Sequence, residues 1–299
     1  MKLSTIGALS TSVLLATVFQ AMAQDAPALP KVLRIYREEI KQGKDVAHEK
    51  TEAAFAKMAA RNKYPNYWLG CNVVAGPTEA WFFEGHDSIM SIQKVTTLVE
   101  TLMEKNPALK AELTNADALN SEMRTNATSM IAVLRDDLSY KASEFAADLG
   151  KTRFFAMTLM RIKPYTDMHF AELGKQVIAA DEKSNSDVPN ATYQIVSGGY
   201  AGTYLLFAPM KSLDKMDEYG SRGKAMMEAM GMEKAAALYK GASEVINSSQ
   251  LFLLAINPKM SYVSKEMAAA DPDFWTPKAT VTTAKPAAPK AAEKAGDGQ

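Results

Sequence analysis

Two histidines at similar places in the two halves of the chain are the first residues that could do chemistry. His48 and His169 lie 169 − 48 = 121 residues apart, and each follows an apolar strand-like run on a stretch with helical spacing. Glu52 and Glu172 follow them by one helical turn, close enough to orient an imidazole or raise its basicity. Both histidines fall on the apolar stripe of their helix, so we expect both to face a sheet and accept a proton. The alternative is a pair of core histidines bonded to backbone carbonyls.

A polar and aromatic set on the predicted strands could line a ligand pocket. Aromatic side chains with a few polar groups are typical of sites for flat organic molecules, although cores use the same residues. In an enzyme, a histidine would remove a proton while Tyr36 and Arg34 would hold the negative charge that develops on the substrate. The predicted ligand-binding residues are Arg34, Tyr36, Glu52, Trp68, Trp81, Glu172, Tyr193 and Tyr204.

No sequence pattern predicts a metal site or a cofactor. The chain has three histidines and one cysteine, without the His-x-x-x-His or paired-cysteine spacing of common metal centres. A metal joining His48, His86 and a carboxylate is compatible with the composition, but nothing in the spacing indicates it. Cys71 lies in an apolar run and is predicted to be a small buried residue. Nucleotide-binding and serine-hydrolase motifs are absent from the sequence. We therefore predict no metal and no cofactor.

The same order of elements occurs twice and would position these residues. A strand-like run over 32–40 is matched by one over 153–162, and each half then continues as α-β-β-α-β. This order is the split βαβ plait, an antiparallel four-stranded sheet with two helices on one face, so the fold class is α+β. The bare face of each sheet needs a partner. We therefore predict two ferredoxin-like plaits packed as an intramolecular, barrel-like pseudo-dimer.

The ends of the chain differ in composition from its middle. Residues 1–23 have the charged start, short apolar stretch and small-residue exit of a signal peptide, with cleavage after Ala23. The expected plaits cover residues 30–140 and 150–265, and residues 276–299 are a predicted disordered tail rich in Ala, Pro and Lys. No later run approaches the roughly 18 apolar residues of a membrane-spanning helix. We therefore expect a periplasmic or secreted protein without a transmembrane anchor.

The charge balance disfavours nucleic acid as a partner. The chain carries 34 Lys and Arg residues against 34 Asp and Glu residues, whereas binding to phosphates favours a strongly basic face. The expected partner is a small molecule. The chain would be a monomer with an internal pseudo-dimer, or a homo-oligomer.

The start of the first plait carries a resemblance to a known superfamily. Leu33-Arg34-Ile35-Tyr36-Arg37, followed by Gln42-Gly43-Lys44, resembles the opening of NIPSNAP-type and antibiotic-biosynthesis-monooxygenase-type domains of the dimeric α+β barrel superfamily. This chain departs from it in having Gln42 where those domains have a proline, and in lacking the glycine in the second copy. The resemblance implies a fold with a cavity between sheet and helices. Members of the superfamily include cofactor-free oxygenases, haem-using and haem-degrading enzymes, and proteins without an established reaction.

Three functions stay open at this point. The first is binding of a small apolar or aromatic ligand, with cofactor-free monooxygenase-type chemistry as its enzymatic form. The second is a non-catalytic scaffold protein of the cell envelope, and the third is a haem-binding or haem-degrading protein. A cavity that holds His48 or His169 beside Tyr36 or Trp81 would favour ligand binding, whereas interiors filled by side chains would favour the scaffold.

Overall fold

The computed structural model describes residues 28–276 of the chain, without the side chains of residues 219 and 220. The predicted signal peptide and the predicted tail, apart from Thr276, lie outside the described residues. No helix within residues 28–276 combines the length and the apolar character that crossing a membrane requires.

Each half of the described chain has the predicted β-α-β-β-α-β order, with one extra helix. The first half consists of β1 (Val32–Ile40), α1 (Asp45–Arg61), β2 (Trp68–Val73), β3 (Glu79–His86), α2 (Ile89–Lys105), α3 (Pro107–Met123) and β4 (Arg124–Leu134). The second half consists of β5 (Phe154–Ile162), α5 (Asp167–Lys183), β6 (Ala191–Ser197), β7 (Thr203–Met210), α6 (Tyr219–Met230), α7 (Met232–Val245) and β8 (Ile246–Ile256). Helix α4 (Ala142–Asp148) connects the halves, and α8 (Lys265–Ala270) and α9 (Pro272–Trp275) follow β8.

The last strand of each half is longer than the apolar pattern predicts. The apolar runs in the sequence predict that these strands start at residues 129 and 250. In the structure, β4 begins at Arg124 and β8 begins at Ile246. The added residues are mostly polar and exposed in both strands, so no burial pattern marks them in the sequence. They are nevertheless paired, because residues of β1 and β5 lie opposite them in the antiparallel ladders.

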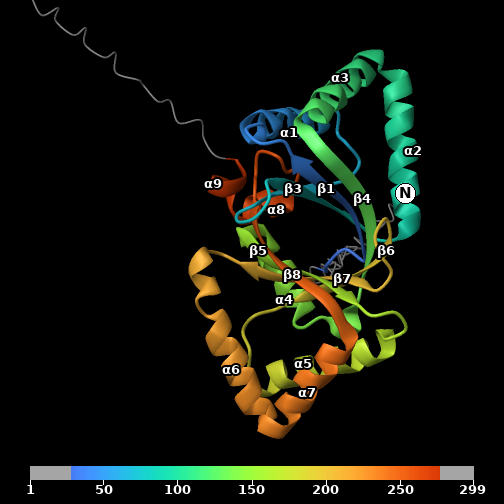
Figure 1. Cartoon of the computed structure of the whole chain (residues 1–299). Coiled ribbons are helices and arrows are strands. Elements are labelled where there is room, and N and C mark those ends of the chain that lie inside the picture. The colour runs from blue at the N-terminus through green and yellow to red at the C-terminus, as the bar shows by residue number, and fades with distance from the viewer. Residues whose placement is uncertain (1–27, 277–299) are drawn as a thin grey trace, which may run out of the picture.

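The eight strands of the described chain close into one barrel. Each half contributes a four-stranded sheet, in the order β4-β1-β3-β2 and β8-β5-β7-β6, and every pairing is antiparallel. Hydrogen bonds between β2 and β8 and between β4 and β6 join the two sheets at both edges. The tandem α+β fold and its barrel-like closure are therefore as predicted (Figure 1).

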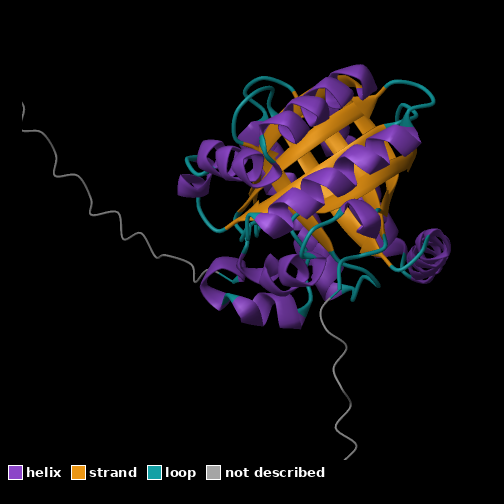
Figure 2. Cartoon of the chain, turned by 90° about the horizontal axis from the view of Figure 1, so that it is seen from below, coloured by secondary structure: helices purple, strands orange, loops and turns teal. Residues whose placement is uncertain are grey.

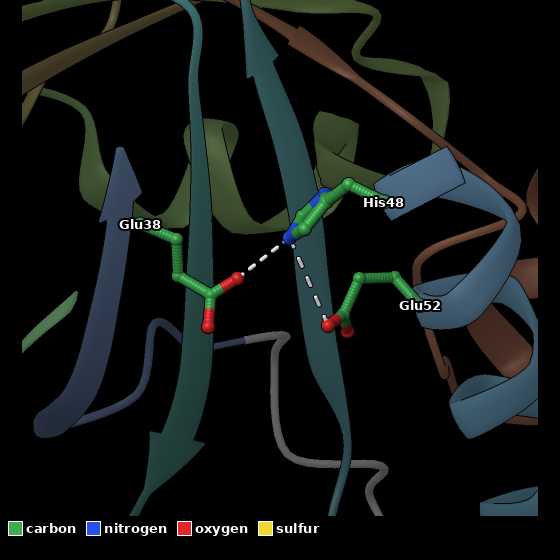
Figure 3. Close-up of side chains that lie close together, drawn as sticks. All are labelled: Glu38, His48 and Glu52. Carbon is green, nitrogen blue, oxygen red and sulfur yellow. Dashed lines mark hydrogen bonds and ion pairs between the residues drawn. The ribbon is translucent and has the colours of Figure 1, made fainter. Parts of the chain in front are cut away.

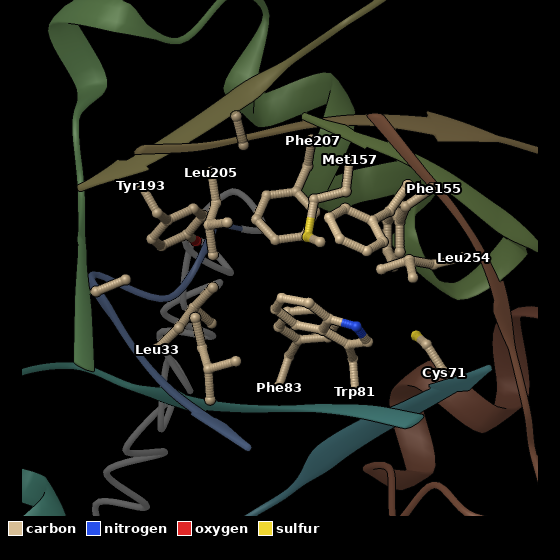
Figure 4. Packing of buried hydrophobic residues seen from close by; sticks show 14 of the residues in the cluster. Leu33, Cys71, Trp81, Phe83, Phe155, Met157, Tyr193, Leu205, Phe207 and Leu254 are labelled. Carbon is tan, nitrogen blue, oxygen red and sulfur yellow. The ribbon is translucent and has the colours of Figure 1, made fainter. Parts of the chain in front are cut away.

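The inner faces of both sheets form one aromatic core. Trp81 from the first half meets Phe252 from the second with ring centroids 5.4 Å apart, and Phe83 meets Phe207 at 5.3 Å. The rings of Trp81 and Phe83 project toward that of Phe207 across the barrel (Figure 4). Burying side chains of this size contributes about 1.5–3 kcal/mol each. Side chains of both halves thus meet across the barrel interior and hold the halves together, and an apolar pocket of about 210 Å³ remains beside Leu33, Phe83 and Phe207.

The helices cover the outside of the barrel on two sides. Helices α1, α2 and α3 lie on the side of the first sheet, and α5, α6 and α7 lie on the side of the second, where α6 packs on α5 and α7 (Figure 1). The view from below shows helices lying across the outside of the strands (Figure 2). Helix α1 packs Ala56 and Ala59 on Trp68 and Phe82 of the sheet. Space for a site outside the core therefore lies between sheet and helices.

Candidate functional site

The outer face of β1 presents a polar row to the covering helices. Side chains alternate along a strand, so Arg34, Tyr36 and Glu38 share one face, whereas the buried Leu33 and Ile35 belong to the barrel core. Pairing with β3 places Arg34 opposite Glu84 and Tyr36 opposite Phe82. The strand thus brings two carboxylates, at Glu38 and Glu84, to either side of Tyr36.

Helix α1 adds a histidine and a third carboxylate to one end of this row. The Nε2 atom of His48 lies 2.7 Å from Oε2 of Glu38 and 3.9 Å from Oε1 of Glu52 (Figure 3). His48 and Glu52 lie one helical turn apart and project on the same side of α1. All three residues are buried, with exposed fractions of 6% for Glu38, 2% for His48 and 8% for Glu52. They are called the triad below.

The junction of α3 and β4 supplies two further side chains to the triad. Nη1 of Arg124 donates to Oε1 of Glu38, and Nδ2 of Asn120 donates to Oε1 of Glu52. Arg124 also donates from Nη2 to Asp117 over 3.2 Å. Glu38 is therefore held from α1 and β4, and Glu52, which lies on α1 itself, is held from α3.

The triad holds two buried carboxylates against one guanidinium. Burial acts to raise the pKa of Glu38, but the hydrogen bonds from His48 and Arg124 outweigh it, so this pKa lies below its usual range. Burial, followed by the nearby charge of Glu38, raises the pKa of Glu52 to about 7. Glu52 is consequently the carboxylate whose negative charge its surroundings compensate least.

A cavity of about 500 Å³ lies between this face of the sheet and the three helices. Glu38, Glu52 and Asn120 border it, and His48 lies behind them. Most of the remaining wall is apolar or aromatic. Its residues are Tyr36, Phe55, Tyr64, Trp68, Phe82, Glu84, Val99, Met103, Leu113, Thr114, Ala116, Asp117 and Arg124. The arrangement offers an apolar molecule a binding space with hydrogen-bonding groups gathered at one end.

The carboxylate of Glu84, at the other end of the polar row, already has hydrogen-bond partners among its neighbours. Asn66 donates to Glu84 over 3.2 Å, Tyr64 donates over 3.4 Å, and Nε2 of His86 lies 3.3 Å away. Nη1 of Arg34 lies 4.0 Å away on the facing strand. His86 is thus buried in a network around Glu84 and serves that network rather than the triad.

The second half lacks the site that the sequence predicts for it. The helices correspond with an offset of 122 residues, from Asp45 to Asp167, and not 121. The counterpart of His48 is therefore the buried Phe170, and His169 is exposed because one residue turns a helix by about 100°. The expectation that His169 faces the sheet is wrong. Glu172 is exposed as well and pairs with Lys175 over 3.0 Å.

Apolar residues replace the whole polar cluster in the second half. With the same offset, the counterparts of Glu38, His48, Glu52, Asn120 and Arg124 are Met160, Phe170, Gly174, Ala242 and Ile246. A Cβ atom on Gly174 would lie 2.7 Å from Cδ2 of Leu138, so Leu138 takes the space beside this glycine. Leu138, Phe170 and Met160 belong to one hydrophobic cluster. The cluster of ionisable groups is therefore a feature of the first half alone.

The predicted aromatic residues separate into two groups. Tyr36 and Trp68 line the cavity beside the triad. Trp81 and Tyr193 instead belong to the barrel core, and the hydroxyl of Tyr193 donates to the carbonyl of Pro30 over 2.8 Å. Tyr204 is buried in the second half, where its hydroxyl donates to Asp167 over 3.1 Å and burial raises its pKa to about 12.

Three residues of the site were missed in the sequence: Glu38, Asn120 and Arg124. Alternation along β1 could have identified Glu38, which is two residues beyond Tyr36 on the same face. No local pattern identifies the other two, because Asn120 meets Glu52 across 68 residues and Arg124 meets Glu38 across 86.

The described histidines do not fit haem. An axial histidine must offer a ring nitrogen to the iron. Nε2 of His48 lies against Glu38, Nε2 of His86 lies against Glu84, and His169 is exposed away from the cavity. A single metal ion is a different case, because Glu38, His48 and Glu52 each offer one atom, and these atoms lie within 4.8 Å of one another.

Comparison with known proteins gives distant similarities of shape. No family model matches the chain, and no curated protein matches it in sequence. A protein from Fusobacterium nucleatum, provisionally named a monooxygenase, is 16% identical with a TM-score of 0.48, covering 77% of this chain and 93% of its own. An anthrone oxidase-like protein is 9% identical with a TM-score of 0.48, covering 78% and 94%. A protein provisionally named a chlorite dismutase is 9% identical with a TM-score of 0.46, covering 80% and 98%. A likeness at this distance assigns neither an activity nor a ligand to this chain.

Proposed function

We propose that this chain binds a small, mainly apolar organic molecule in the cavity between the first sheet and helices α1 to α3, and that the triad accepts a proton from it. One observation carries the proposal: a buried group of Glu38, His48 and Glu52 lies at one end of a largely apolar cavity of about 500 Å³. Ligand pockets in proteins commonly measure about 300–1,000 Å³ and combine apolar walls with a few polar groups.

The triad residues have different roles in this proposal. Glu38 and Glu52 border the cavity and contact the ligand, whereas His48 holds both carboxylates from behind. When the ligand's O–H or C–H bond breaks, the proton passes to the triad and the electron pair stays on the ligand. Tyr36 lines the cavity and would face the charge that develops. Arg34 does not line it, but its Cζ lies 5.0 Å from the centroid of the Tyr36 ring, so its positive charge would act from behind that ring.

Cofactor-free oxygenation is the enzymatic form of the same proposal. It begins with removal of a proton from an activated substrate and then consumes dioxygen as the co-substrate. Oxygen uptake therefore separates this activity from ligand binding alone. The scaffold alternative predicts interiors filled by side chains. The cavity beside the triad argues against it, as do a cavity of about 500 Å³ in the second half and one of about 210 Å³ beside the barrel core.

Export is part of the proposal. Its support is the pattern of residues 1–23, which lie outside the described part of the chain. A molecule met outside the cytoplasm would then be the ligand.

Native mass spectrometry of protein isolated from its own source tests the proposal. We expect one bound organic molecule per chain. The Phe55→Trp variant, which narrows the cavity, should retain less of it, whereas Tyr165→Trp at a fully exposed position should keep it. Undiminished retention of the molecule by a correctly folded Phe55→Trp protein would place the ligand elsewhere. Absence of any bound molecule, together with failure to bind a panel of phenolic and aliphatic probes, would refute the proposal.

A further inference from the structure

We infer that Glu38, His48, Glu52 and Asn120 form a binding site for one divalent transition-metal ion at the polar end of the cavity. The metal site is argued from these side chains and does not depend on the proposed organic ligand. The ion would occupy the triad atoms that accept the ligand's proton, so proton acceptance belongs to the metal-free chain, and a role of the ion in holding the ligand's polar group rests on the proposed function as well.

The spacing of the triad suits one shared cation. One oxygen from each carboxylate and one nitrogen from the imidazole lie within 4.8 Å of one another. Bonds of about 2.0–2.2 Å to one ion place neighbouring ligand atoms roughly 3–3.5 Å apart. The separations of 2.7 Å from Nε2 of His48 to Oε2 of Glu38, and 3.9 Å to Oε1 of Glu52, lie on either side of that range. Small side-chain rotations are enough to bring the three atoms around an ion.

Asn120 provides an independent observation that points to a ligand. This residue is 7% exposed, borders the same cavity as Glu38 and Glu52, and its Oδ1 has no hydrogen-bond partner within the described residues. Buried carbonyl oxygens in proteins are nearly always paired. Nδ2 of the same amide donates to Glu52, so the unpaired oxygen belongs to the triad's immediate surroundings. A cation supplies what this oxygen lacks.

The charges around the triad also favour a cation. Arg124 donates to Oε1 of Glu38, which leaves Oε2 directed at His48. Residues that hold the second oxygen of a metal-binding carboxylate orient the first, and Arg124 is placed to do this. Its single positive charge balances one of the two buried carboxylates and leaves the negative charge of the other for a cation. Arg124 is thus a positioning residue for the site.

The donor set indicates the class of metal. One imidazole nitrogen and three oxygens suit first-row divalent ions such as Mn²⁺, Fe²⁺, Co²⁺ and Zn²⁺. A soft ion such as Cu⁺ favours sulfur, which the proposed ligands lack, and Cys71 is fully buried in the barrel core. Ca²⁺ and Mg²⁺ favour sites built from oxygen alone.

The second half offers matched controls for the test. His169 and Glu172 are the same residue types on the equivalent helix, but both are exposed. Substitutions at these two positions change the same functional groups without touching the proposed ligands. A difference between the two sets of variants therefore reports on the site itself.

Titration with Co²⁺ is the experiment that tests the inference. The full chain is purified with a chelator, freed of it, and titrated while calorimetry and visible absorption are recorded. We expect one Co²⁺ per chain. His48→Gln and Glu52→Gln should each weaken binding at least about 100-fold, and Asn120→Leu about 10-fold, while His169→Gln and Glu172→Gln leave it unchanged.

Two results would overturn the inference. One is wild-type protein that binds no Co²⁺ in a one-to-one ratio. The other is Asn120→Leu and His48→Gln proteins with native circular dichroism that bind Co²⁺ as tightly as the two control variants. The test is separate from that of the proposed function. A chain that binds Co²⁺ but carries no organic molecule and binds none of the phenolic and aliphatic probes would refute the proposed function and leave the metal site standing.

Discussion

Replacing Glu52 by glutamine should change how stability depends on pH in the metal-free protein. In the folded chain, burial and the charge of Glu38 raise the pKa of Glu52 from 4.5 to about 7. Between these values the folded state keeps a proton that the unfolded state has lost, so the free energy of unfolding falls as the pH rises. At 1.36 kcal/mol for each unit, the full effect is about 3 kcal/mol. Glutamine at this position cannot titrate and should remove the effect.

Urea unfolding at a series of pH values, with a chelator present, measures this effect. The quantity of interest is the stability of Glu52→Gln minus that of the wild type, because most other titrating groups contribute equally to both. We expect this difference to grow by about 3 kcal/mol in favour of the variant between pH 4.5 and pH 7. The exposed Glu172→Gln should show no such trend. A difference for Glu52→Gln that stays constant over this range would refute the electrostatic description of the triad.

Three further substitutions test the structure of the barrel and its covering helices. Arg37→Met should lower stability by about 3 kcal/mol in urea unfolding, because Arg37 holds the buried Glu79 through two hydrogen bonds of 2.9 and 2.7 Å. Arg61→Met breaks an exposed ion pair and should cost less than about 1 kcal/mol, so equal losses in the two variants would contradict this reasoning. Gly70→Ala should cost roughly 1–3 kcal/mol, because a Cβ atom there would lie 2.8 Å from the carbonyl oxygen of Met260. An unchanged thermal unfolding midpoint would show that the strand and the Met260 segment are less closely packed.

The order of elements was predictable from the sequence, because each strand carries its own apolar pattern. The predicted run over 32–40 coincides with β1, and that over 153–162 matches β5 to within one residue. The exposed first residues of β4 and β8 were not predictable. They are strand residues because they pair with β1 and β5, and not because they are buried.

The site was only partly predictable from the sequence, because the residue offset between the two halves was misjudged by one. Aligning the two histidines implied an offset of 121 residues, whereas the elements correspond at 122. On a helix that single residue separates the buried His48 from the exposed His169. The faces of β3 were equally hard to assign from the sequence. Trp81 and Phe82 are both buried, although they lie on opposite faces of the sheet. Local pattern could not decide which face held the cavity.

The most direct test of the account is nitrogen-15 NMR of the three imidazoles as the small molecule identified by mass spectrometry is added. The chain has only His48, His86 and His169, so each ring can be assigned by substitution. The account predicts that the His48 signals shift most, that those of His86 shift less, and that those of the exposed His169 stay unchanged. A shift confined to His169, or saturation of binding with the His48 signals unmoved, would contradict it.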